Sequence, residues 1–331
     1  MIAASAALLP VILFLAALFL MDSFKLVPVR SVAAALAGGA VAAFAALWLH
    51  QEVLPFDGAS PQFVSRYVAP ITEEAAKGLL VVLLIAAGRV GFLVDAAVLG
   101  FAIGAGFAVV ENVVYLRTLS NAPFALWLVR GLGTAMLHGA TTAIVAMITR
   151  ERMDRRNRLP LAFLPGFALA VIIHSASNHL LLQPVAQALI VMMMLPAIVV
   201  WIFDRSERAT REWVSAGLDL DLEVLQLVVS NQFAVTRFGQ YLQQLRARFP
   251  GAVVADMYCL LRLELELAVQ AKALVMARGA GLELPADDDL DAALAERDYL
   301  QRSIGRTGLL ALRPLQITSY RDQWHRRLLR R

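Results

Sequence analysis

Residues 97–115, AVLGFAIGAGFAVVENVVY, form a nearly unbroken apolar run with a single acidic residue near its end. Together with its flanks (91–117), the run exceeds the roughly 20 apolar residues that an α-helix needs to cross a bilayer. Gly100 and Gly104 have the small-xxx-small spacing that permits close packing of membrane helices. The stretch therefore predicts a transmembrane helix that carries Glu111 into the membrane.

Six further apolar runs of similar length precede residue 204, and the same rule predicts that each spans the membrane. They cover residues 2–21, 30–50, 63–87, 122–149, 160–182 and 184–203. The first run has no Lys or Arg before it, so we interpret it as a retained helix and not as a secretory signal. The predicted fold class is all-α, a polytopic transmembrane helical bundle of about seven spans.

The pattern changes after Asp204, where amphipathic helical periodicity and most of the charge begin. We predict a transmembrane domain over 1–203 and a soluble helical domain over 204–331. The organising stretches of the second domain are the apolar segments 222–228 and 253–276, the acidic turn 285–289 and the basic tail 326–331. Its lone His325 and Cys259 indicate no chemical site, so an interaction or regulatory domain with a partner of its own is expected.

The distribution of Lys and Arg predicts the orientation, because cytoplasmic loops carry an excess of these residues. The segment 150–158 is strongly basic, and with seven spans the same side holds Lys25, Arg30, Arg89, Arg205, Arg208 and Arg211. The longest opposite loop, 51–62, carries Glu52 and Asp57 instead. The expected arrangement is a multi-pass protein of the cell (inner) membrane, with the N-terminus outside and the C-terminus in the cytoplasm.

Composition excludes several classes of protein. The chain is 59% hydrophobic and only 17% charged, outside the usual range of soluble domains. Its one cysteine excludes a disulfide framework within the chain and a cysteine-based zinc site. The two signs of charge nearly cancel in the second domain, so no nucleic-acid partner is expected. The expected partners are the lipid bilayer and a membrane-anchored protein.

Charged side chains remain inside the apolar runs, although each costs about 2.5–3.5 kcal/mol near the centre of a membrane helix. They include residues 72–77, Glu111, Arg130, His138 and the segment 174–179. At a rise of ~1.5 Å per residue, Glu73, Glu111 and His174 lie roughly 10–15 Å below the outer ends of their helices. This common layer predicts one shared site, with His138 deeper, near the level of Lys77.

Helical spacing places several of these groups on common faces. Lys77 follows Glu73 by four residues and Glu74 by three, so it can neutralise either carboxylate. An ionised glutamate in such a cluster can act as general base toward water, and a protonated neighbour can return the proton to a leaving amine. His174 and Asn178 share a face and can donate hydrogen bonds to an oxyanion.

Structural interpretations of the same residues remain open. Glu73 and Glu74 can form ion pairs with Lys77 and Arg66 at a helix end. Glu111 can be a packing residue that is hydrogen-bonded, with Tyr115 as a candidate partner. Arg130 is expected to pair with a carboxylate, either Glu111 or Glu74, because an unpaired charge is costly in the membrane.

The ordered motifs resemble those of a known family. Residues 73–77, Glu-Glu-Ala-Ala-Lys, match the Glu-Glu-x-x-Lys motif of the PrsW family of intramembrane glutamate-dependent proteases. Residues 107–111, Phe-Ala-Val-Val-Glu, match its Phe-x-x-x-Glu motif, and His138 and His174 fall where later motifs carry histidines. The wider superfamily contains the CAAX prenyl proteases and Abi proteins. Prenyl proteases end the second motif in His and place the basic residue of the first one position later, so the resemblance favours PrsW.

The resemblance implies an intramembrane endopeptidase that cleaves membrane-anchored proteins, such as an anti-sigma factor, near the extracytoplasmic side. The residues it implicates in catalysis are Glu73, Glu74, Glu111, His174 and His138, supported by Lys77, Asn178, Phe107 and Arg130. It covers roughly the second to the sixth apolar run and does not extend to the second domain.

The sequence leaves the metal question open. Glu74, His138 and His174 offer a carboxylate and two imidazoles, which together can hold a divalent metal such as Zn²⁺. However, no His-Glu-x-x-His motif is present, and the sequence therefore favours a metal-free water activated by glutamate. No other cofactor is expected.

Two alternatives to a protease fit the same residues. Intramembrane Glu, His and Lys also relay protons, so a proton-coupled transporter is one alternative. That reading expects inverted repeats and broken helices, and the only hint is Pro70, just before the paired glutamates. The other alternative is a non-catalytic membrane scaffold that keeps these residues for stability.

Overall fold

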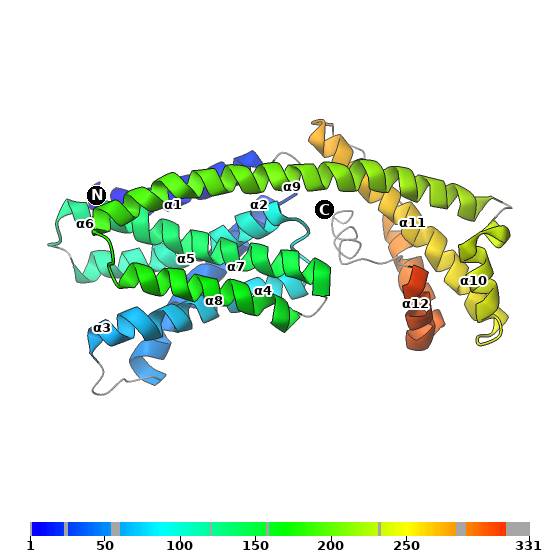
Figure 1. Cartoon of the computed structure of the whole chain (residues 1–331), viewed down its shortest axis with the longest axis horizontal. Coiled ribbons are helices and arrows are strands. Elements are labelled where there is room, and N and C mark those ends of the chain that lie inside the picture. Colours follow the sequence, from blue (N-terminus) through cyan, green and yellow to red (C-terminus); the bar gives the residue numbers. More distant parts are fainter. Residues whose placement is uncertain are drawn as a thin grey trace. The chain divides into compact units, whose positions relative to one another are not determined.

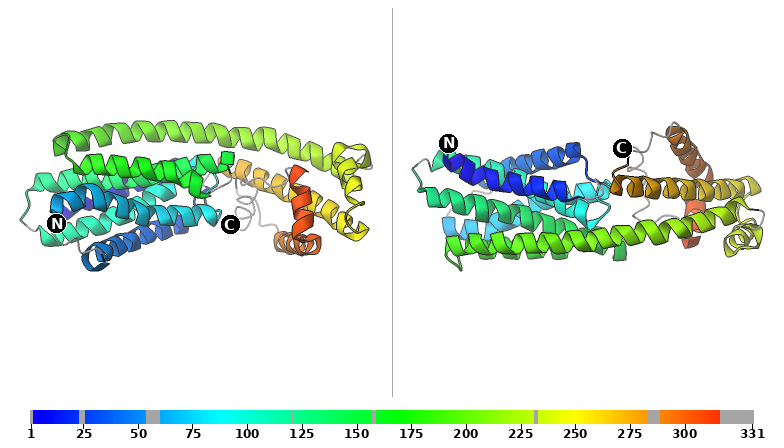
Figure 2. Two further views of the ribbon diagram at one scale, coloured as in Figure 1. Left: turned by 60° about the horizontal axis from the view of Figure 1, so that its bottom comes forward. Right: turned by 90° about the horizontal axis from the view of Figure 1, so that it is seen from above.

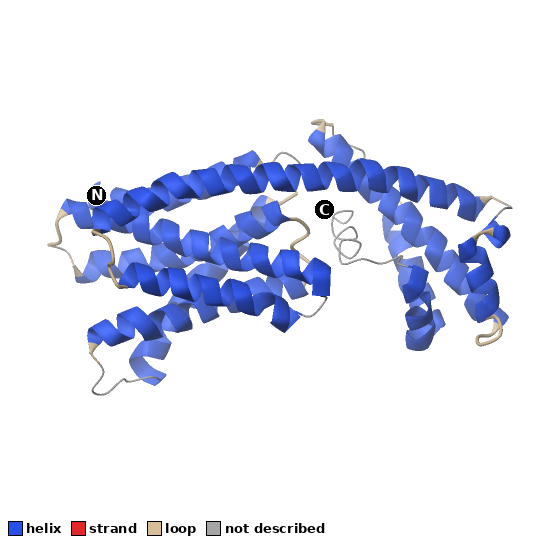
Figure 3. Cartoon of the chain, viewed as in Figure 1, coloured by secondary structure: helices blue, strands red, loops and turns tan. Residues whose placement is uncertain are grey.

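The computed structural model is helical throughout, and the residues that it describes form no strand (Figure 3). It describes residues 2–22, 26–53, 60–119, 121–156, 159–230, 233–282 and 289–315. Outside this part lie several residues used in the sequence analysis: Lys25, Asp57, Arg158, residues 285–288, His325 and the basic tail. The chain divides into two compact units, Met1–Glu207 and Arg208–Arg331.

Six helices are long and apolar enough to cross a membrane, so the structure confirms a transmembrane helical protein with a C-terminal helical region (Figure 1). They are α1 (Ile2–Met21), α2 (Val29–Trp48), α5 (Leu93–Thr118), the run of α6 (Phe124–Val129), η3 (Arg130–Thr134) and α7 (Ala135–Arg156), α8 (Leu159–Asn178) and α9 (Pro184–Val229). Each agrees with an apolar run of the sequence, although α9 continues beyond the predicted end at residue 203.

The predicted span 63–87 is not one of these six. The chain is helical there, as α3 (Pro61–Phe63), η2 (Val64–Val68) and α4 (Ala69–Ala86). Glu73, Glu74 and Lys77 all lie within the 18 residues of α4, which is more charge than any of the six helices carries in its apolar stretch. Length and composition of the described helices therefore identify six spans, and α4, where the sequence predicts another, differs from them by its charge.

Helix α4 nevertheless belongs to the core of the first unit. The helices α2, α5, α7, α8 and α4 contact one another in that order, and α4 also contacts α2, so the five close a ring. Figure 2 shows in two views that the helices of this unit run side by side. Glu74 and Lys77 are fully buried within this ring. Neighbouring helices thus shield the charges of α4 from lipid, which removes the cost that charge would have on an isolated membrane helix.

Helix α5 is the most buried member of the ring, and its glycines explain why. A Cβ atom at Gly104 would lie 2.1 Å from the backbone oxygen of His138 on α7, and one at Gly106 would lie 1.9 Å from that of Leu36 on α2. The helices can approach this closely only because glycine has no side chain. Neither backbone can make room for a Cβ atom without moving a whole helix. The small-residue spacing seen in the sequence therefore does bring the helices into close contact.

Gly104→Ala is expected to destabilise the first unit by about 1–3 kcal/mol, because overpacking forces backbone shifts. It should also move α7 away from α5 and so weaken the site that these helices form. Thermal unfolding of the purified protein in detergent measures the effect. Gly251→Ala is the matched control, since nothing lies within 4 Å of a Cβ atom there. Equal melting temperatures for the two variants would contradict the prediction.

Asp95 and Arg150 hold the short connection between α4 and α5. The Asp95 carboxylate accepts hydrogen bonds from the backbone amides of Gly91 (2.7 Å) and Phe92 (3.1 Å), which caps the start of α5. The buried Arg150 guanidinium donates to the Gly91 carbonyl oxygen at 2.6 and 2.9 Å. Arg150, expected in a basic loop, therefore has a structural role at the end of α7.

The second unit is a small helical assembly around an apolar core. It contains the end of α9, η4 (Phe233–Val235), α10 (Arg237–Leu245), α11 (Gly251–Gly279), α12 (Leu290–Leu312) and η5 (Arg313–Leu315). Glu264 and Arg297 form a buried ion pair at 2.6 Å between α11 and α12. The amphipathic pattern after residue 204 thus predicted helices correctly.

Candidate functional site

Glu74 of α4 is at the centre of a polar cluster inside the ring of helices. Its Oε1 atom accepts hydrogen bonds from Lys77 Nζ at 2.6 Å, His174 Nδ1 at 2.9 Å and Thr141 Oγ1 at 3.3 Å. Its Oε2 atom is buried and has no hydrogen-bond partner in the described part of the chain. Glu74 therefore anchors three helices through one oxygen and keeps a second acceptor available.

His138 of α7 connects the two acidic helices. Its Nδ1 atom is 3.0 Å from Lys77 Nζ, and its Nε2 atom is 3.0 Å from Glu111 Oε2. Because an ammonium group only donates, Nδ1 accepts, and Nε2 carries the proton that is donated to Glu111. The imidazole of His174 is perpendicular to that of His138, with ring centroids 4.9 Å apart.

Glu111 of α5 has a cationic partner as well. Arg130 Nη2 of η3 is 3.2 Å from Glu111 Oε1, so Arg130 pairs with one of the two carboxylates that the sequence allowed. Arg130 also donates through Nε to Asn112 Oδ1 at 2.8 Å and lies 3.7 Å from the centre of the Tyr115 ring. Asn112 in turn donates to the Ala7 carbonyl oxygen at 2.8 Å, which fixes Arg130 to α1.

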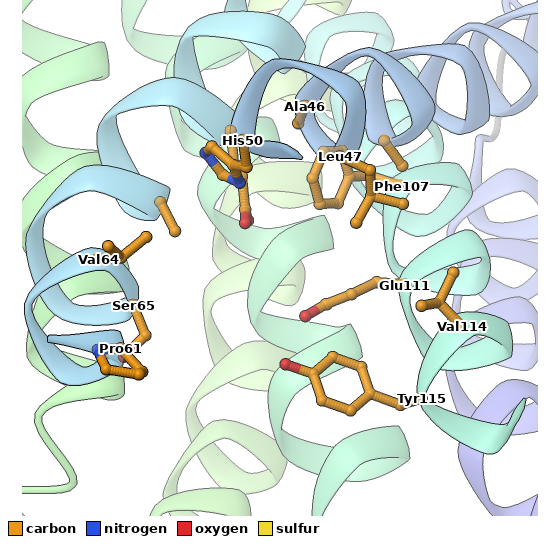
Figure 4. Close-up of a pocket in the computed structure, with 13 residues that line it drawn as sticks. Ala46, Leu47, His50, Pro61, Val64, Ser65, Phe107, Glu111, Val114 and Tyr115 are labelled. Atoms are coloured by element: carbon orange, nitrogen blue, oxygen red, sulfur yellow. The ribbon is translucent and has the colours of Figure 1, made fainter. Parts of the chain in front are cut away.

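Glu73 points in a different direction from Glu74, as adjacent residues of a helix must. Its Oε2 atom is 3.8 Å from His174 Nε2, and its side chain is 15% exposed, whereas that of Glu74 is fully buried. Glu73 and Glu111 both line a cavity of about 460 Å³. Figure 4 shows the Glu111 carboxylate and the Tyr115 hydroxyl extending from α5 into this cavity.

Phe107 forms part of the same site. Its ring lies 4.9 Å from Lys77 Nζ and 5.2 Å from the ring of His138, and it also lines the cavity. A cation near an aromatic face is stabilised by the ring quadrupole. Phe107 therefore helps to hold the buried Lys77 beside the cavity.

The structure places His138 beside Lys77, as expected from the sequence. His138 also bonds to Glu111 and contacts His174, so it joins the layer that was expected above it. The depth estimate compared positions along the helix axes, whereas the two ring nitrogens of the imidazole reach a partner on either side.

Asn178 is also not where the sequence placed it. Although it is four residues from His174, its amide donates to the Ser65 carbonyl oxygen at 2.8 Å and does not join the cluster. Ser175 donates to the neighbouring Arg66 carbonyl oxygen at 2.6 Å. Both acceptors belong to the π-helical segment η2, so the end of α8 holds the wall of the cavity instead of binding an oxyanion.

Two residues of the site were missed in the sequence. Thr141 donates to Glu74, and its position three residues after His138 on the same helix was the available signal. Tyr115 was considered only as a packing partner of Glu111, but its hydroxyl reaches the cavity. Its spacing of four residues from Glu111 indicated a shared face and could have identified it.

Glu73, His138 and His174 can hold a metal ion, because one ligand atom from each lies within 4.8 Å of the others. A carboxylate with two imidazoles is the ligand set of several catalytic zinc sites. His174 fits this role directly, since its Nδ1 proton is donated to Glu74 and its Nε2 lone pair faces Glu73. His138 fits less directly, because its Nδ1 lone pair accepts from Lys77 and its Nε2 proton is donated to Glu111. Glu74, named in the ligand set from sequence, faces Lys77 instead.

Comparisons with known proteins agree with this geometry. Residues 27–202, just over half of the chain, match the family described as the PrsW family intramembrane metalloprotease, a match that includes all four helices bearing the acidic and imidazole groups. No curated protein and no solved structure matches the chain. The extent of the family match shows that the chain belongs to the PrsW family of intramembrane metalloproteases.

Proposed function

We propose that this protein is an endopeptidase of the cell membrane that cleaves membrane-anchored proteins, such as an anti-sigma factor-like regulator, near the extracytoplasmic side. One observation carries the proposal: carboxylates from α4 and α5 and imidazoles from α7 and α8 converge beside a single cavity. Membership of the family supports protease activity. Hydrolysis inside a membrane needs this combination of a water-holding cavity and groups that move protons.

In the proposed reaction, Glu73 and His174 orient a water molecule at the edge of the cavity, and Glu111 accepts its proton. Glu111 is suited to this role because it lines the cavity and because Arg130 stabilises its ionised form. The resulting hydroxide attacks the carbonyl carbon of the scissile peptide bond. Glu111 then gives the proton to the leaving amine, so the carboxylate is regenerated.

The developing oxyanion needs a hydrogen-bond donor, and the Tyr115 hydroxyl is in the right place. It lines the cavity beside Glu111 and has Arg130 behind its ring. Tyr115 takes this role in place of Asn178, whose amide donates to the carbonyl oxygen of Ser65 in the cavity wall. A donor aimed at the oxyanion contributes about 3–4 kcal/mol in other hydrolases.

A metal ion bound by Glu73, His138 and His174 would polarise the substrate carbonyl and make the bound water more acidic. Glu111 lines the cavity beside these residues and would keep its role as base. Glu74 would fix the orientation of the His174 imidazole through its hydrogen bond to Nδ1. Glu73 and His174 would then act as ligands, whereas without the ion they orient the water directly.

We count α4 as a seventh span, because neighbouring helices bury its charges. The orientation of the chain in the membrane follows from this count. Seven spans place the N-terminus outside and the C-terminus inside, in agreement with the positive residues near Arg150 and Arg205. The cavity then opens on the extracytoplasmic side. The second unit is in the cytoplasm, where we propose that it binds a partner or regulates access to the site.

A comparison of membrane-protein fragments tests the proposal. In cells that produce the Glu73→Gln variant, the intact ectodomains of substrates should accumulate, and the fragments released by the unchanged protein should be missing. Glu151→Gln, at a half-exposed ion pair outside the site, is the control and should behave as the unchanged protein. Identical fragment patterns for both variants would rule out the proposed activity. Proton-driven uptake into vesicles without cleavage would favour a transporter.

A further inference from the structure

We propose that the cavity between α2 and the segment Pro61–Val68 holds about three residues of the substrate in extended form, with Leu47 and Val64 selecting their side chains. This inference rests on the proposed protease function. It adds where the substrate lies, how much of it is bound and which residues set the preference.

The cavity has two walls from different parts of the chain. One is formed by the C-terminal half of α2 and the facing part of α5, and includes Leu47 and Phe107. The other is formed by α3 and η2 and includes Val64 and Ser65. Figure 4 shows Val64 and Ser65 on one side, Leu47 and Phe107 on the other, and Glu111 extending from α5 toward the space between them.

The volume limits the length of the segment that can bind, and the chemistry then selects its conformation. A helix with its side chains is about 10–12 Å wide, so one turn of 5.4 Å occupies roughly 420–610 Å³. A cavity of about 460 Å³ holds at most one such turn. An extended residue, at about 3.3 Å by 4.8 Å by 10 Å, occupies roughly 160 Å³, so the same space takes about three residues. Only the extended form also exposes the peptide carbonyl to attack.

The lining of the cavity predicts which residues fit. Its lining includes two carboxylates, Glu73 and Glu111, and neither Lys nor Arg. An acidic substrate side chain would therefore meet carboxylates of its own sign, which is unfavourable. On the side of α2, the lining includes the apolar residues Ala43, Ala46 and Leu47. Small or medium apolar residues fit this space best.

The wall opposite α2 is held rigidly, as a binding site for an extended chain requires. Segment η2 is π-helical, and the carbonyl oxygens of Ser65 and Arg66 are bonded to Asn178 and Ser175 of α8. These bonds tie the wall to the helix that carries His174. The distance between the wall and the reacting groups is therefore set by α8.

Aromatic side chains mark where the substrate enters. Trp48 at the end of α2 is 61% exposed, and Phe63 and Tyr67 on the opposite wall are 48% and 50% exposed. Exposed aromatic residues of membrane proteins concentrate at the interface between hydrocarbon and water. A transmembrane substrate ends its helix at this level, so its backbone can enter the cavity sideways in unwound form.

Cleavage of a defined peptide library tests the preference. The full-length enzyme in liposomes is incubated with synthetic peptides that each contain one transmembrane helix. The peptides differ in the amino acids that follow this helix, and mass spectrometry identifies where each is cut. Leu47→Trp should lower kcat/KM about tenfold or more for segments with Leu or Phe, and less than about threefold for Ala and Gly. Val41→Trp is the matched control. Val41 of α2 is 67% exposed and does not line the cavity, so the change should leave the preference for cut sites unchanged.

A second measurement does not depend on turnover. Ser65→Cys in a Cys259→Ser background should react with a water-soluble maleimide, and a library peptide in excess should slow the reaction about tenfold. Leu47→Trp should slow the maleimide reaction even when no peptide is present, because the larger side chain fills the cavity that Ser65 lines. Cleavage with the same residue profile in Leu47→Trp, or labelling that no peptide slows, would overturn the proposed cavity site. No cleavage by the unchanged enzyme together with peptide-protected labelling would instead overturn the protease function and leave the binding site standing.

Discussion

Glu111→Gln is expected to lower kcat for cleavage by about 10²–10⁴-fold, the usual loss when a general base is removed. The amide has the same shape as the carboxylate, and its oxygen still accepts the proton of His138 Nε2, which lies 3.0 Å from Glu111 Oε2. The amide nitrogen then faces Arg130, which loses its carboxylate partner, so some stability is lost as well, and kcat is compared at a temperature where the variant is folded.

The decisive measurement is kcat for a single-span peptide in liposomes, with the melting temperature measured on the same preparation. Combining Glu111→Gln with Glu73→Gln should cost little more than either change alone, because groups that act in one step are strongly non-additive. Activity within about threefold of the unchanged enzyme would remove Glu111 from the mechanism. Additive losses would indicate that the two carboxylates act in separate steps.

Lys77→Met is expected to destabilise the protein by about 3–5 kcal/mol, the usual cost of breaking a buried ion pair from one side. Lys77 and Glu74 are both fully buried and pair at 2.6 Å. Without the ammonium group, the Glu74 carboxylate retains two neutral donors but no full positive charge. A buried carboxylate in that state has lost its hydration without a compensating charge.

The free energy of unfolding, from chemical denaturation in mixed micelles, checks this prediction. The double variant Lys77→Met with Glu74→Gln should recover most of the lost stability, since it leaves no unpaired charge, yet it should not recover full activity. Arg205→Met is the control: its pair with Glu151 at 3.2 Å is about half exposed, so the change should cost at most about 1 kcal/mol. Equal losses of unfolding free energy for Lys77→Met and Arg205→Met would show that breaking the buried pair costs no more than breaking the exposed one.

The sequence was sufficient for the helical architecture, because a membrane imposes its requirement on each segment separately. A run such as 97–115 must be helical whatever its neighbours are, since its backbone polar groups have no other partners in lipid. The same local logic predicted a span at α4 but does not explain how its charge is tolerated. Its charge is acceptable only because α2, α7 and α8 surround it, and that is a property of the assembled bundle.

The candidate site was predicted only in part, because some of its features depend on one helix and others on how several helices pack. Motif spacing identified Glu73, Glu111 and His174, because residues on one helix face are fixed by a period of 3.6. The sequence placed His138 near Lys77 but did not predict its bond to Glu111, since that bond depends on how α7 packs against Gly104 of α5.

The amino-acid sequence by itself determined that the chain forms membrane helices and which of them carry acidic and imidazole groups. Tertiary structure alone decided how those groups divide their work: Glu74 is buried against Lys77, while Glu73 and Glu111 face a cavity. It also moved Asn178 from the reacting groups to the cavity wall. The physical reason is that hydropathy and helical period act within a segment, whereas the direction of a side chain relative to other helices depends on how the helices pack.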